Sequence, residues 1–523
     1  MGGNDMAVHS ATDDLYNAAD DLIGRNLKAG RGDKTAFIDV SGPTTYAQLD
    51  ARVNQFANVL ADHNVRIEER VLLCLPDTID WPTCFLGAIR AGAVPIPVNT
   101  RLTADDYKFM LDDSRARVLV VSEALLDAFL PHLADHPFLD TVIVSGADGK
   151  GYALLKDELN GKPPDYQTAP TRASDMCFWL YTSGTTGKPK GAVHLQTHLI
   201  DTANLYAIPV LGIHEKDICF SAAKLFFAYG LGNGLTFPMS VGATSVLLAG
   251  PPDAKSVARI LREEKPTIFY GVPTLYGMLL ASGELPKKGD HAVRLATSAG
   301  EALPADLLRR FKEATGVDIL DGLGSTEMLH IFLSNTLDNI IPGSSGKPVP
   351  GYDLRLVDDD GTVLTGAGEM GMLEVSGPTS AILYWNQRDK SRETFQGMWT
   401  RTGDKYVRDE NGVYTHAGRS DDMLKVGGIY VSPVEVESAI VRHEKVLEVA
   451  VVGHADQDGL IKPKAFIVLR DGIRPDDALS DEIKAFVKAE LASYKYPRWI
   501  EFLDELPKTA TGKIQRFKLR DAT

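Results

Sequence analysis

The chain has 523 residues, of which 44% are hydrophobic, and its formal net charge is −15 with a pI near 5.3. A chain of this length exceeds one ordinary hydrophobic core, so we expect at least two globular domains. The acidic balance disfavours nucleic acid or an anionic membrane as the main partner, because both are bound through basic surfaces.

Apolar runs of strand length alternate with helical stretches over the first four hundred residues. A strand over 71–75, a helix over 81–90 and a strand over 93–98 form the first expected βαβ unit. Further strand-like runs occupy 118–121, 176–181, 192–195, 244–248 and 267–270. This alternation predicts the α/β class, with mostly parallel sheets covered by helices.

After Gly418 the pattern restarts on a smaller scale. We expect a helix over 434–441, strands over 446–452 and 465–469, and a helix over 481–491. The sequence therefore predicts an N-terminal domain over 1–419 and a small α+β domain over 420–523, which meet in the polar segment around Asp421.

The sequence shows neither the pattern of a targeting signal nor that of a disulfide or zinc framework. The first residues lack a basic region followed by an apolar core, and no run of eighteen apolar residues occurs later, so we expect a cytoplasmic protein. The four cysteines lie in apolar segments without metal-ligand spacing, which favours buried free thiols. They are Cys74, Cys84, Cys177 and Cys219.

The segment 181–191, Tyr-Thr-Ser-Gly-Thr-Thr-Gly-Lys-Pro-Lys-Gly, has the composition of a phosphate-binding loop. Glycines let the backbone approach an anion, and hydroxyl, amide and lysine groups supply donors and positive charge. It is not a P-loop, because only two residues separate Gly184 from Gly187, where that motif has four, and Pro189 follows Lys188. A solvated linker is the alternative for such composition, but strand-like runs flank the segment on both sides.

This loop resembles that of the adenylate-forming superfamily, which includes acyl-CoA synthetases, the adenylation domains of nonribosomal peptide synthetases and firefly luciferase. Further motifs match in the order of that family: Gly-Glu-Ala-Leu-Pro at 300–304, Gly-Ser-Thr-Glu at 324–327, Thr-Arg-Thr-Gly-Asp at 400–404, and the segments 418–428 and 507–513. The resemblance covers nearly the whole chain. It implies a large N-terminal adenylation domain and a small, mobile C-terminal lid domain.

The resemblance also implies the nucleotide site, in which Asp404 accepts hydrogen bonds from the ribose hydroxyls and Arg419 supports the ribose. The implied ATP/AMP-binding residues are Thr182, Ser183, Gly184, Thr185, Thr186, Lys190, Gly300, Glu301, Ala302, Asp321, Gly322, Ser325, Asp404 and Arg419. One departure concerns Leu323, where many members of the family carry a tyrosine that packs on adenine. Leucine offers apolar contact without the same stacking.

Three catalytic residues are implied: Thr326 contacts the α-phosphate, Glu327 helps to position Mg²⁺, and Lys513 bridges the carboxylate and ATP. Positive charge is needed because two anions must approach one another. Asp421 is the implied hinge, and rotation there would remove Lys513 and bring Gly427 and Gly428 towards the pantetheine arm of CoA. His194 and His198, near the phosphate loop, are expected to be packed histidines rather than catalysts.

The aromatic cluster and small residues of segment 224–233 suit a flat carboxylate pocket, although aromatic residues at such spacing are ordinarily part of a core, and it is the family resemblance that favours the pocket. Two further walls are expected at 298–300 and around Gly324. The pocket residues are Phe226, Ala228, Tyr229, Ala299, Gly324, His330 and Ile331. Together with 325–332 and 494–498, they resemble the benzoate-CoA and 4-hydroxybenzoate-CoA ligase branch of the superfamily.

These features predict an ATP-dependent, AMP-forming aromatic acid–CoA ligase, with benzoate as the leading acid and ATP, Mg²⁺ and CoA as cofactors or co-substrates. 4-Hydroxybenzoate or another substituted benzoate is the nearest alternative. A stand-alone enzyme that loads a carrier protein is a second alternative. The absence of a carrier domain after Thr523 disfavours a modular synthetase, but a separate carrier protein would leave no mark in this sequence. A non-catalytic nucleotide sensor is a third. The resemblance leaves open two further partners, namely enzymes that reversibly acetylate Lys513 and a second copy in a homodimer.

Overall fold

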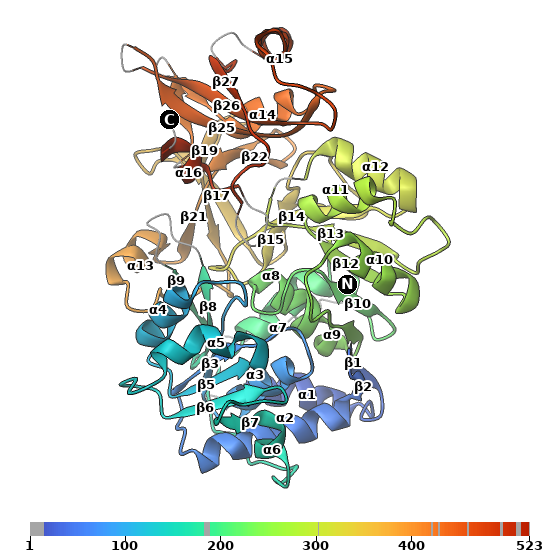
Figure 1. The fold of residues 1–523 in the computed structure, drawn as a ribbon, viewed down its shortest axis with the longest axis vertical. Helices are drawn as coiled ribbons and strands as arrows, with labels where there is room; N and C mark the ends of the chain where they lie inside the picture. The colour runs from blue at the N-terminus through green and yellow to red at the C-terminus, as the bar shows by residue number, and fades with distance from the viewer. Residues whose placement is uncertain are drawn as a thin grey trace, which may run out of the picture. The chain divides into compact units, whose positions relative to one another are not determined.

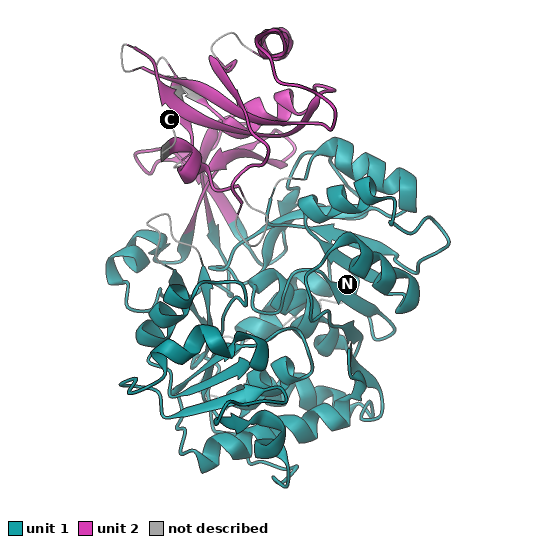
Figure 2. Ribbon diagram, in the orientation of Figure 1, with its two compact units in different colours: residues 1–353, 375–400 teal, residues 354–374, 401–523 magenta. Residues whose placement is uncertain are grey.

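A computed structural model describes residues 15–182, 189–301, 303–419, 422–426, 429–457, 460–491, 495–508 and 514–521. The chain forms two compact units (Figure 2): unit 1 comprises residues 1–353 and 375–400, and unit 2 comprises 354–374 and 401–523. Unit 2 thus takes in two segments that precede the expected boundary at residue 419. The position of the hinge itself stays a prediction.

The largest sheet of unit 1 has nine strands in the order β16-β15-β14-β13-β12-β10-β11-β1-β2 (Figure 1). Strands β1 and β10 to β14 run parallel, whereas β2, β15 and β16 pair antiparallel. The strands are β1 (Thr35–Asp39), β2 (Gly42–Thr45), β10 (Ile218–Ser221), β11 (Thr244–Val246), β12 (Ile268–Gly271), β13 (Leu295–Ser298), β14 (Ile319–Gly324), β15 (Ile331–Ser334) and β16 (Lys347–Pro348).

Three helices cover this sheet: α10 (Ala254–Glu263), α11 (Pro273–Ser282) and α12 (Ala305–Thr315). Their side chains Val257, Tyr276 and Phe311 share one buried cluster with Phe269 of β12 and Ile319 of β14. Apolar residues at helical spacing thus bury one stripe of each helix against the strands. The packing fixes the carboxyl ends of β13 and β14, where predicted adenine-binding residues lie.

A second sheet of unit 1 is entirely parallel, with the order β4-β3-β5-β6-β7. Its strands are β3 (Arg70–Cys74), β4 (Val94–Pro97), β5 (Val118–Ser122), β6 (Thr141–Ser145) and β7 (Ala153–Leu154). Leu72 and Leu119 pack with Tyr107 of α4 (Ala104–Ser114) and Phe129 of α5 (Leu126–Phe129). Strands β3, β4 and β5 are almost entirely buried, which explains their continuous apolar runs, whereas β6 and β7 are only partly buried.

The predicted phosphate loop lies in an antiparallel hairpin of β8 (Met176–Thr182) and β9 (Lys190–Leu195). The segment 382–385 extends this hairpin, because Ile382 N–H donates to Val193 O at 3.0 Å and Trp385 N–H donates to Gly191 O at 2.8 Å. Residues far apart in the sequence are therefore held side by side next to the loop.

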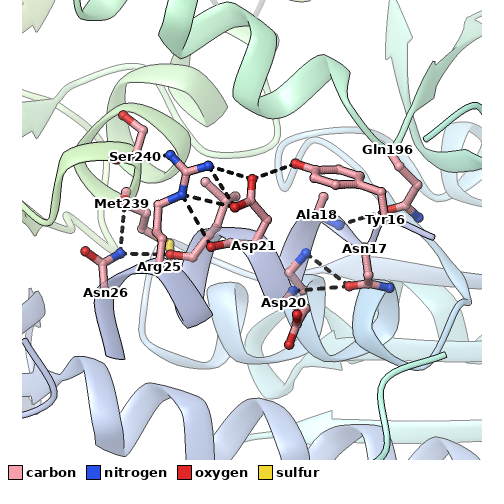
Figure 3. A network of polar contacts seen from close by, with 12 residues as sticks. Tyr16, Asn17, Ala18, Asp20, Asp21, Arg25, Asn26, Gln196, Met239 and Ser240 are labelled. Carbon is pink, nitrogen blue, oxygen red and sulfur yellow. Dashed lines mark hydrogen bonds and ion pairs between the residues drawn. The ribbon is translucent and has the colours of Figure 1, made fainter. Parts of the chain in front are cut away.

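The first described helix, α1 (Ala18–Lys28), ties the far end of this hairpin to the rest of unit 1. Figure 3 shows Arg25 paired with Asp21, with its Nη2 at 2.6 Å from Oδ2, while the Tyr16 hydroxyl donates to the same carboxylate at 2.8 Å. Gln196, directly after β9, accepts the Ala18 N–H at 2.9 Å. The network thereby anchors the strand that carries Lys190.

Unit 1 contains further helices and helical turns. They are α2 (Tyr46–Asp62), α3 (Asp80–Arg90), α6 (Leu155–Leu159), α7 (His198–Thr202), α8 (Ala228–Leu231), α9 (Phe237–Val241) and α13 (Arg388–Thr394), with 3₁₀ turns η1 (Glu123–Leu125) and η2 (Leu130–His132) and π-helical turns η3 (Ala203–Ala207) and η4 (Gly232–Thr236).

The strands β17 to β22 form a six-stranded sheet of order β18-β17-β19-β21-β20, with β22 paired to β21. They are β17 (Asp353–Val357), β18 (Val363–Leu364), β19 (Met370–Ser376), β20 (Phe395–Gln396), β21 (Trp399–Arg408) and β22 (Tyr414–Arg419). The pairs β17–β18, β20–β21 and β21–β22 are antiparallel. The strand periodicity of this region was absent from our sequence prediction.

The rest of unit 2 combines a three-stranded sheet of order β25-β26-β27 and a two-stranded β23-β24 sheet with helices. The elements are β23 (Leu424–Val426), β24 (Ile429–Val431), α14 (Pro433–Ile440), β25 (Val446–Ala455), β26 (Ile461–Leu469), α15 (Asp477–Glu490), β27 (Trp499–Phe502) and α16 (Arg516–Asp521). Val436, Val451 and Ile483 share its main buried cluster.

The predicted elements are confirmed, with boundaries that shift by a few residues. The mixed α/β class is also confirmed, as are the four buried free cysteines. Within the described ranges, every helix is too short or too polar to span a membrane.

Candidate active site

The hairpin β8–β9 places two predicted phosphate-binding residues opposite one another, since Thr182 pairs with Lys190. The Lys190 ammonium lies over the ring of Tyr384, with Nζ 4.4 Å from the ring centroid. The other predicted phosphate residues, Ser183, Gly184, Thr185 and Thr186, lie outside the described residues. The same holds for Ala302, Asp421, Gly427, Gly428 and Lys513.

The predicted adenine border lies at the carboxyl ends of two adjacent parallel strands, where open α/β sheets bind ligands. Ser298 of β13 pairs with Asp321 of β14, so Gly300 and Gly322 follow on neighbouring strands. Burial raises the pKa of Asp321 well above its ordinary value, although the Leu303 N–H and the Ser298 hydroxyl oppose the shift. Gly300 has φ = +91°, a conformation that glycine adopts without strain.

Ser325, Thr326 and Glu327 form the turn between β14 and β15, and neighbouring groups hold it from several sides. The Ser325 hydroxyl accepts the Met328 N–H at 3.2 Å. Glu327 O accepts the Ala381 N–H at 2.7 Å, and the Tyr384 hydroxyl donates to Glu327 Oε1 at 2.6 Å. The predicted catalytic pair thus lies in a turn with a fixed backbone.

A buried histidine pair lies behind the same turn. His194 Nε2 is 2.9 Å from the Thr326 carbonyl oxygen, and His194 Nδ1 is 3.1 Å from His198 Nδ1. Burial lowers the pKa of His194 to about 4 and that of His198 well below its ordinary value. A carbonyl only accepts, so Nε2 of neutral His194 carries the proton. The expectation of packed histidines is confirmed, and the structure adds their hydrogen bond to the turn.

His330 is the centre of an aromatic cluster. The rings of Tyr229, Tyr206 and Phe237 lie 5.5, 5.5 and 4.5 Å from its ring, centroid to centroid. His330 Nε2 is 3.2 Å from Asn233 Oδ1, and burial lowers the pKa of His330 to about 3. The imidazole is therefore neutral and lies among aromatic rings.

The predicted pocket segments come together around this cluster. A side chain at Gly232 would place its Cβ 2.4 Å from His330 Cδ2, so the close approach of η4 to His330 requires glycine. The Tyr229 hydroxyl is 2.5 Å from Thr297 Oγ1 of β13. The remaining predicted pocket residues Phe226, Ala228, Ala299 and Ile331 are buried, and Gly324 is half-buried.

In unit 2, the predicted ribose residues lie on paired strands, with Asp404 of β21 opposite Arg419 of β22. Arg419 Nη1 is 3.3 Å from Asp404 Oδ1 and donates at the same distance to Thr402 O. His416 Nε2 is 3.7 Å from the same carboxylate oxygen. Arg419 and His416 thus hold the carboxylate of Asp404, whose side chain is 14% exposed.

Sequence reasoning missed Tyr384, Tyr206 and Phe237. Tyr384 follows Glu327 by 57 positions and carried no motif in our reading, while Tyr206 and Phe237 lie in or next to π-helical turns. Such turns are often found at functional sites, but sequence periodicity does not reveal them. Leu323, the noted departure, pairs with Leu333 in the β14–β15 ladder and is half-buried.

Comparison with known protein families identifies the class of enzyme to which this fold belongs. Residues 25–385 match the AMP-binding enzyme family, and residues 435–513 match the AMP-binding enzyme C-terminal domain. The chain belongs to the AMP-binding enzyme family.

Individual relatives narrow the comparison. The chain is 59% identical to a benzoate–CoA ligase of Thauera aromatica over 97% of this chain and 96% of that protein. It is 49% identical to a 4-hydroxybenzoate–CoA/benzoate–CoA ligase of Rhodopseudomonas palustris, over 97% and 94%. The crystal structure of a benzoate–CoA ligase from Burkholderia xenovorans LB400 has a TM-score of 0.90 at 51% identity, covering 97% of this chain and all of that one.

Proposed function

We propose that this chain is an AMP-forming benzoate–CoA ligase. The observation that carries the proposal is the 59% identity to a benzoate–CoA ligase over 97% of the chain. The reaction has two halves: the benzoate carboxylate attacks the α-phosphorus of ATP and pyrophosphate leaves, and then the CoA thiol attacks the acyl carbon of benzoyl-AMP and AMP leaves.

Adenylation requires that two anions meet, so the residues of unit 1 have to position and neutralise them. Lys190 and the Thr182 end of β8 would hold the β- and γ-phosphates, and the Thr326 hydroxyl would contact the α-phosphate. Glu327 and Ser325 lie in the same turn. In unit 2, the Asp404 carboxylate would accept hydrogen bonds from the ribose hydroxyls, supported by Arg419.

The donor set around Glu327 fits Mg²⁺ carried by the nucleotide. Within the described ranges, no group of three or more His, Cys, Asp or Glu side chains could hold a metal ion by itself. Mg²⁺ is commonly bound by one or two carboxylates together with substrate phosphates, and Glu327 offers one carboxylate. When bound, Mg²⁺ would neutralise charge on the phosphates.

Lys513, Asp421, Gly427 and Gly428 keep the roles predicted for them, as catalytic lysine, hinge and CoA contacts. The sharpest test is Lys513→Ala, which should nearly abolish benzoate-dependent pyrophosphate release yet largely spare thioester formation from supplied benzoyl-AMP. Equal loss in both half-reactions would contradict the hinge. Acetylation of Lys513, a homodimer and a cytoplasmic location also stay predictions.

The choice of acid is tested by pyrophosphate release with MgATP across benzoate, 4-hydroxybenzoate, 2-aminobenzoate, cyclohexanecarboxylate and hexanoate, with and without CoA. We expect the highest kcat/KM with benzoate and turnover that depends on CoA, since an aromatic, largely apolar surround favours the unsubstituted ring. A preference for 4-hydroxybenzoate would keep the chemistry and change the acid. A preference for hexanoate would reject the aromatic pocket, and transfer to a carrier protein but not to CoA would reject the acceptor.

A further inference from the structure

Tyr384 touches two predicted active-site residues that carry opposite charges. Its hydroxyl donates to Glu327 Oε1 at 2.6 Å, and its ring faces the Lys190 ammonium at 4.4 Å. The two contacts use different parts of one side chain, the phenol hydroxyl and the π face. Both are strong for their kind, because one partner of each is charged.

The position of Tyr384 is fixed by its surroundings. Its neighbours Ile382 and Trp385 are hydrogen-bonded to β9, the strand that begins at Lys190. The Tyr384 N–H donates to the Ser391 hydroxyl at 2.9 Å, and its ring packs against that of Phe395 at 5.1 Å between centroids. The side chain is 3% exposed. A rotamer held in this way does not have to be ordered when a ligand binds.

The two contacts leave the charge of both groups in place. The hydroxyl donates a neutral hydrogen bond to Oε1 of Glu327, and the carboxylate stays an anion. The ring lies on one side of the Lys190 ammonium, whose three N–H donors point in different directions. Tyr384 therefore orients both groups without removing their charge.

We propose that Tyr384 is a positioning residue that holds Glu327 and Lys190 in register for the phosphates of ATP and their cation. The inference rests on the proposed function, and it assigns no contact between Tyr384 and the reacting atoms. Its role would be to set the geometry of two groups that arise from different segments of unit 1.

Two substitutions separate the hydroxyl from the ring. Tyr384→Phe keeps the π face and removes the hydrogen bond to Glu327, whereas Tyr384→Leu removes both contacts. Tyr46→Phe is the matched control, because the hydroxyl of Tyr46 donates to Ala243 O at 2.7 Å and is equally buried. That control also loses one buried hydrogen bond, but the bond does not involve Glu327 or Lys190.

The first readout is equilibrium binding of Mn²⁺ in the presence of α,β-methylene-ATP, followed by electron paramagnetic resonance. Tyr384→Phe should weaken Mn²⁺ binding about tenfold, the loss typical of a hydrogen bond to a charged group, and leave metal-free binding of the analogue unchanged. Tyr384→Leu should in addition weaken metal-free binding of the analogue several-fold. Tyr46→Phe should match the wild type in both.

The outcomes distinguish this inference from the proposed function. Wild-type protein that fails to release pyrophosphate with any acid rejects the function. An active wild type whose Tyr384→Phe variant binds Mn²⁺ equally well or more tightly rejects the positioning role alone. Thermal unfolding of all three variants shows whether each is folded, and equal weakening in Tyr46→Phe and Tyr384→Phe would identify a merely structural tyrosine.

Discussion

Replacing Arg516 should destabilise unit 2 by an amount that the structure bounds. Arg516 Nη2 donates to both carboxylate oxygens of Glu437, at 2.9 and 2.8 Å, and Nε adds a third bond at 3.2 Å. The Arg516 and Glu437 side chains are only 18% and 13% exposed. The pair links α16 to α14, and α16 begins three residues after Lys513.

Removing one partner of a buried ion pair costs about 3–5 kcal/mol, because the other charge stays buried without compensation. Arg516→Met should lower the free energy of unfolding by about this amount. Replacing both residues by Met should recover most of the loss, since Asp422, the second partner of Arg516, keeps its ion pair with Arg520 at 3.1 Å and apolar side chains of similar volume fill the space.

The pH dependence has a definite sign. Burial raises the pKa of Glu437, and Arg516 opposes that rise, so in Arg516→Met the pKa rises further. A carboxyl with a raised pKa in the folded state contributes stability that is fully present below its ordinary value, near 4.5, and is lost as the pH rises through the folded value. The single variant should therefore be less stable at pH 8 than at pH 5, relative to wild type.

Urea unfolding at both pH values measures these differences, and separate assays of the two half-reactions show their effect on function. Ile514, two residues before α16, forms an antiparallel bridge with Lys508. Lys513 precedes Ile514, so loosening α16 should affect the step that needs Lys513. Pyrophosphate release should therefore be impaired more than thioester formation from supplied benzoyl-AMP. The reasoning fails if Arg516→Met unfolds with unchanged free energy, or if the double variant is no more stable than the single one.

Two further substitutions test the site, and a third tests the stability of unit 1. His194→Leu should slow benzoate-dependent pyrophosphate release about tenfold, and His194→Gln should slow it less, since the buried Thr326 carbonyl needs a donor. Steady-state kinetics with an unchanged KM for benzoate would support this. Equal rates in the two variants would refute it. Asp404→Ala should weaken ATP binding about tenfold in calorimetry yet leave 2′,3′-dideoxy-ATP binding unaffected, and equal losses would contradict the ribose role. Burial raises the pKa of Asp77 to about 6 against the pull of Lys224, so its contribution to stability is present below about pH 3.8 and is lost as the pH rises through 6. In Asp77→Asn, the free energy of unfolding should vary less with pH over that range. An unchanged pH profile would show that Asp77 is not the titrating group.

Much of the fold could be predicted because local patterns and packing agree. Continuous apolar runs such as 71–75 and 118–121 identify strands buried on both faces, and the motif segments stand at the ends of such strands. Ser298 and Asp321 lie side by side because β13 pairs with β14, and the sequence pattern did not predict this pairing.

The sequence said less where function depends on contacts between distant segments. Nothing local in Tyr384 indicates that its hydroxyl reaches Glu327, because that contact requires the segment 382–385 to join β9. The bond from His194 to the Thr326 carbonyl has the same origin. Side-chain geometry of this kind follows from tertiary packing, and periodicity carries no trace of it.

Because His330 is neutral, it cannot compensate the negative charge of a carboxylate substrate, and another group has to do so. Its pKa, lowered by burial to about 3, leaves the imidazole uncharged at pH 7, and the aromatic rings around it bring no cation. Transferring a carboxylate into such a surround without a compensating charge is costly. Under the proposed function, affinity for the ring and neutralisation of the carboxylate would therefore be separate tasks, the first falling to the cluster around His330 and the second to Lys513. On this argument, an uncharged aromatic amide should bind Lys513→Ala as well as it binds the wild type, whereas benzoate should bind the variant more weakly.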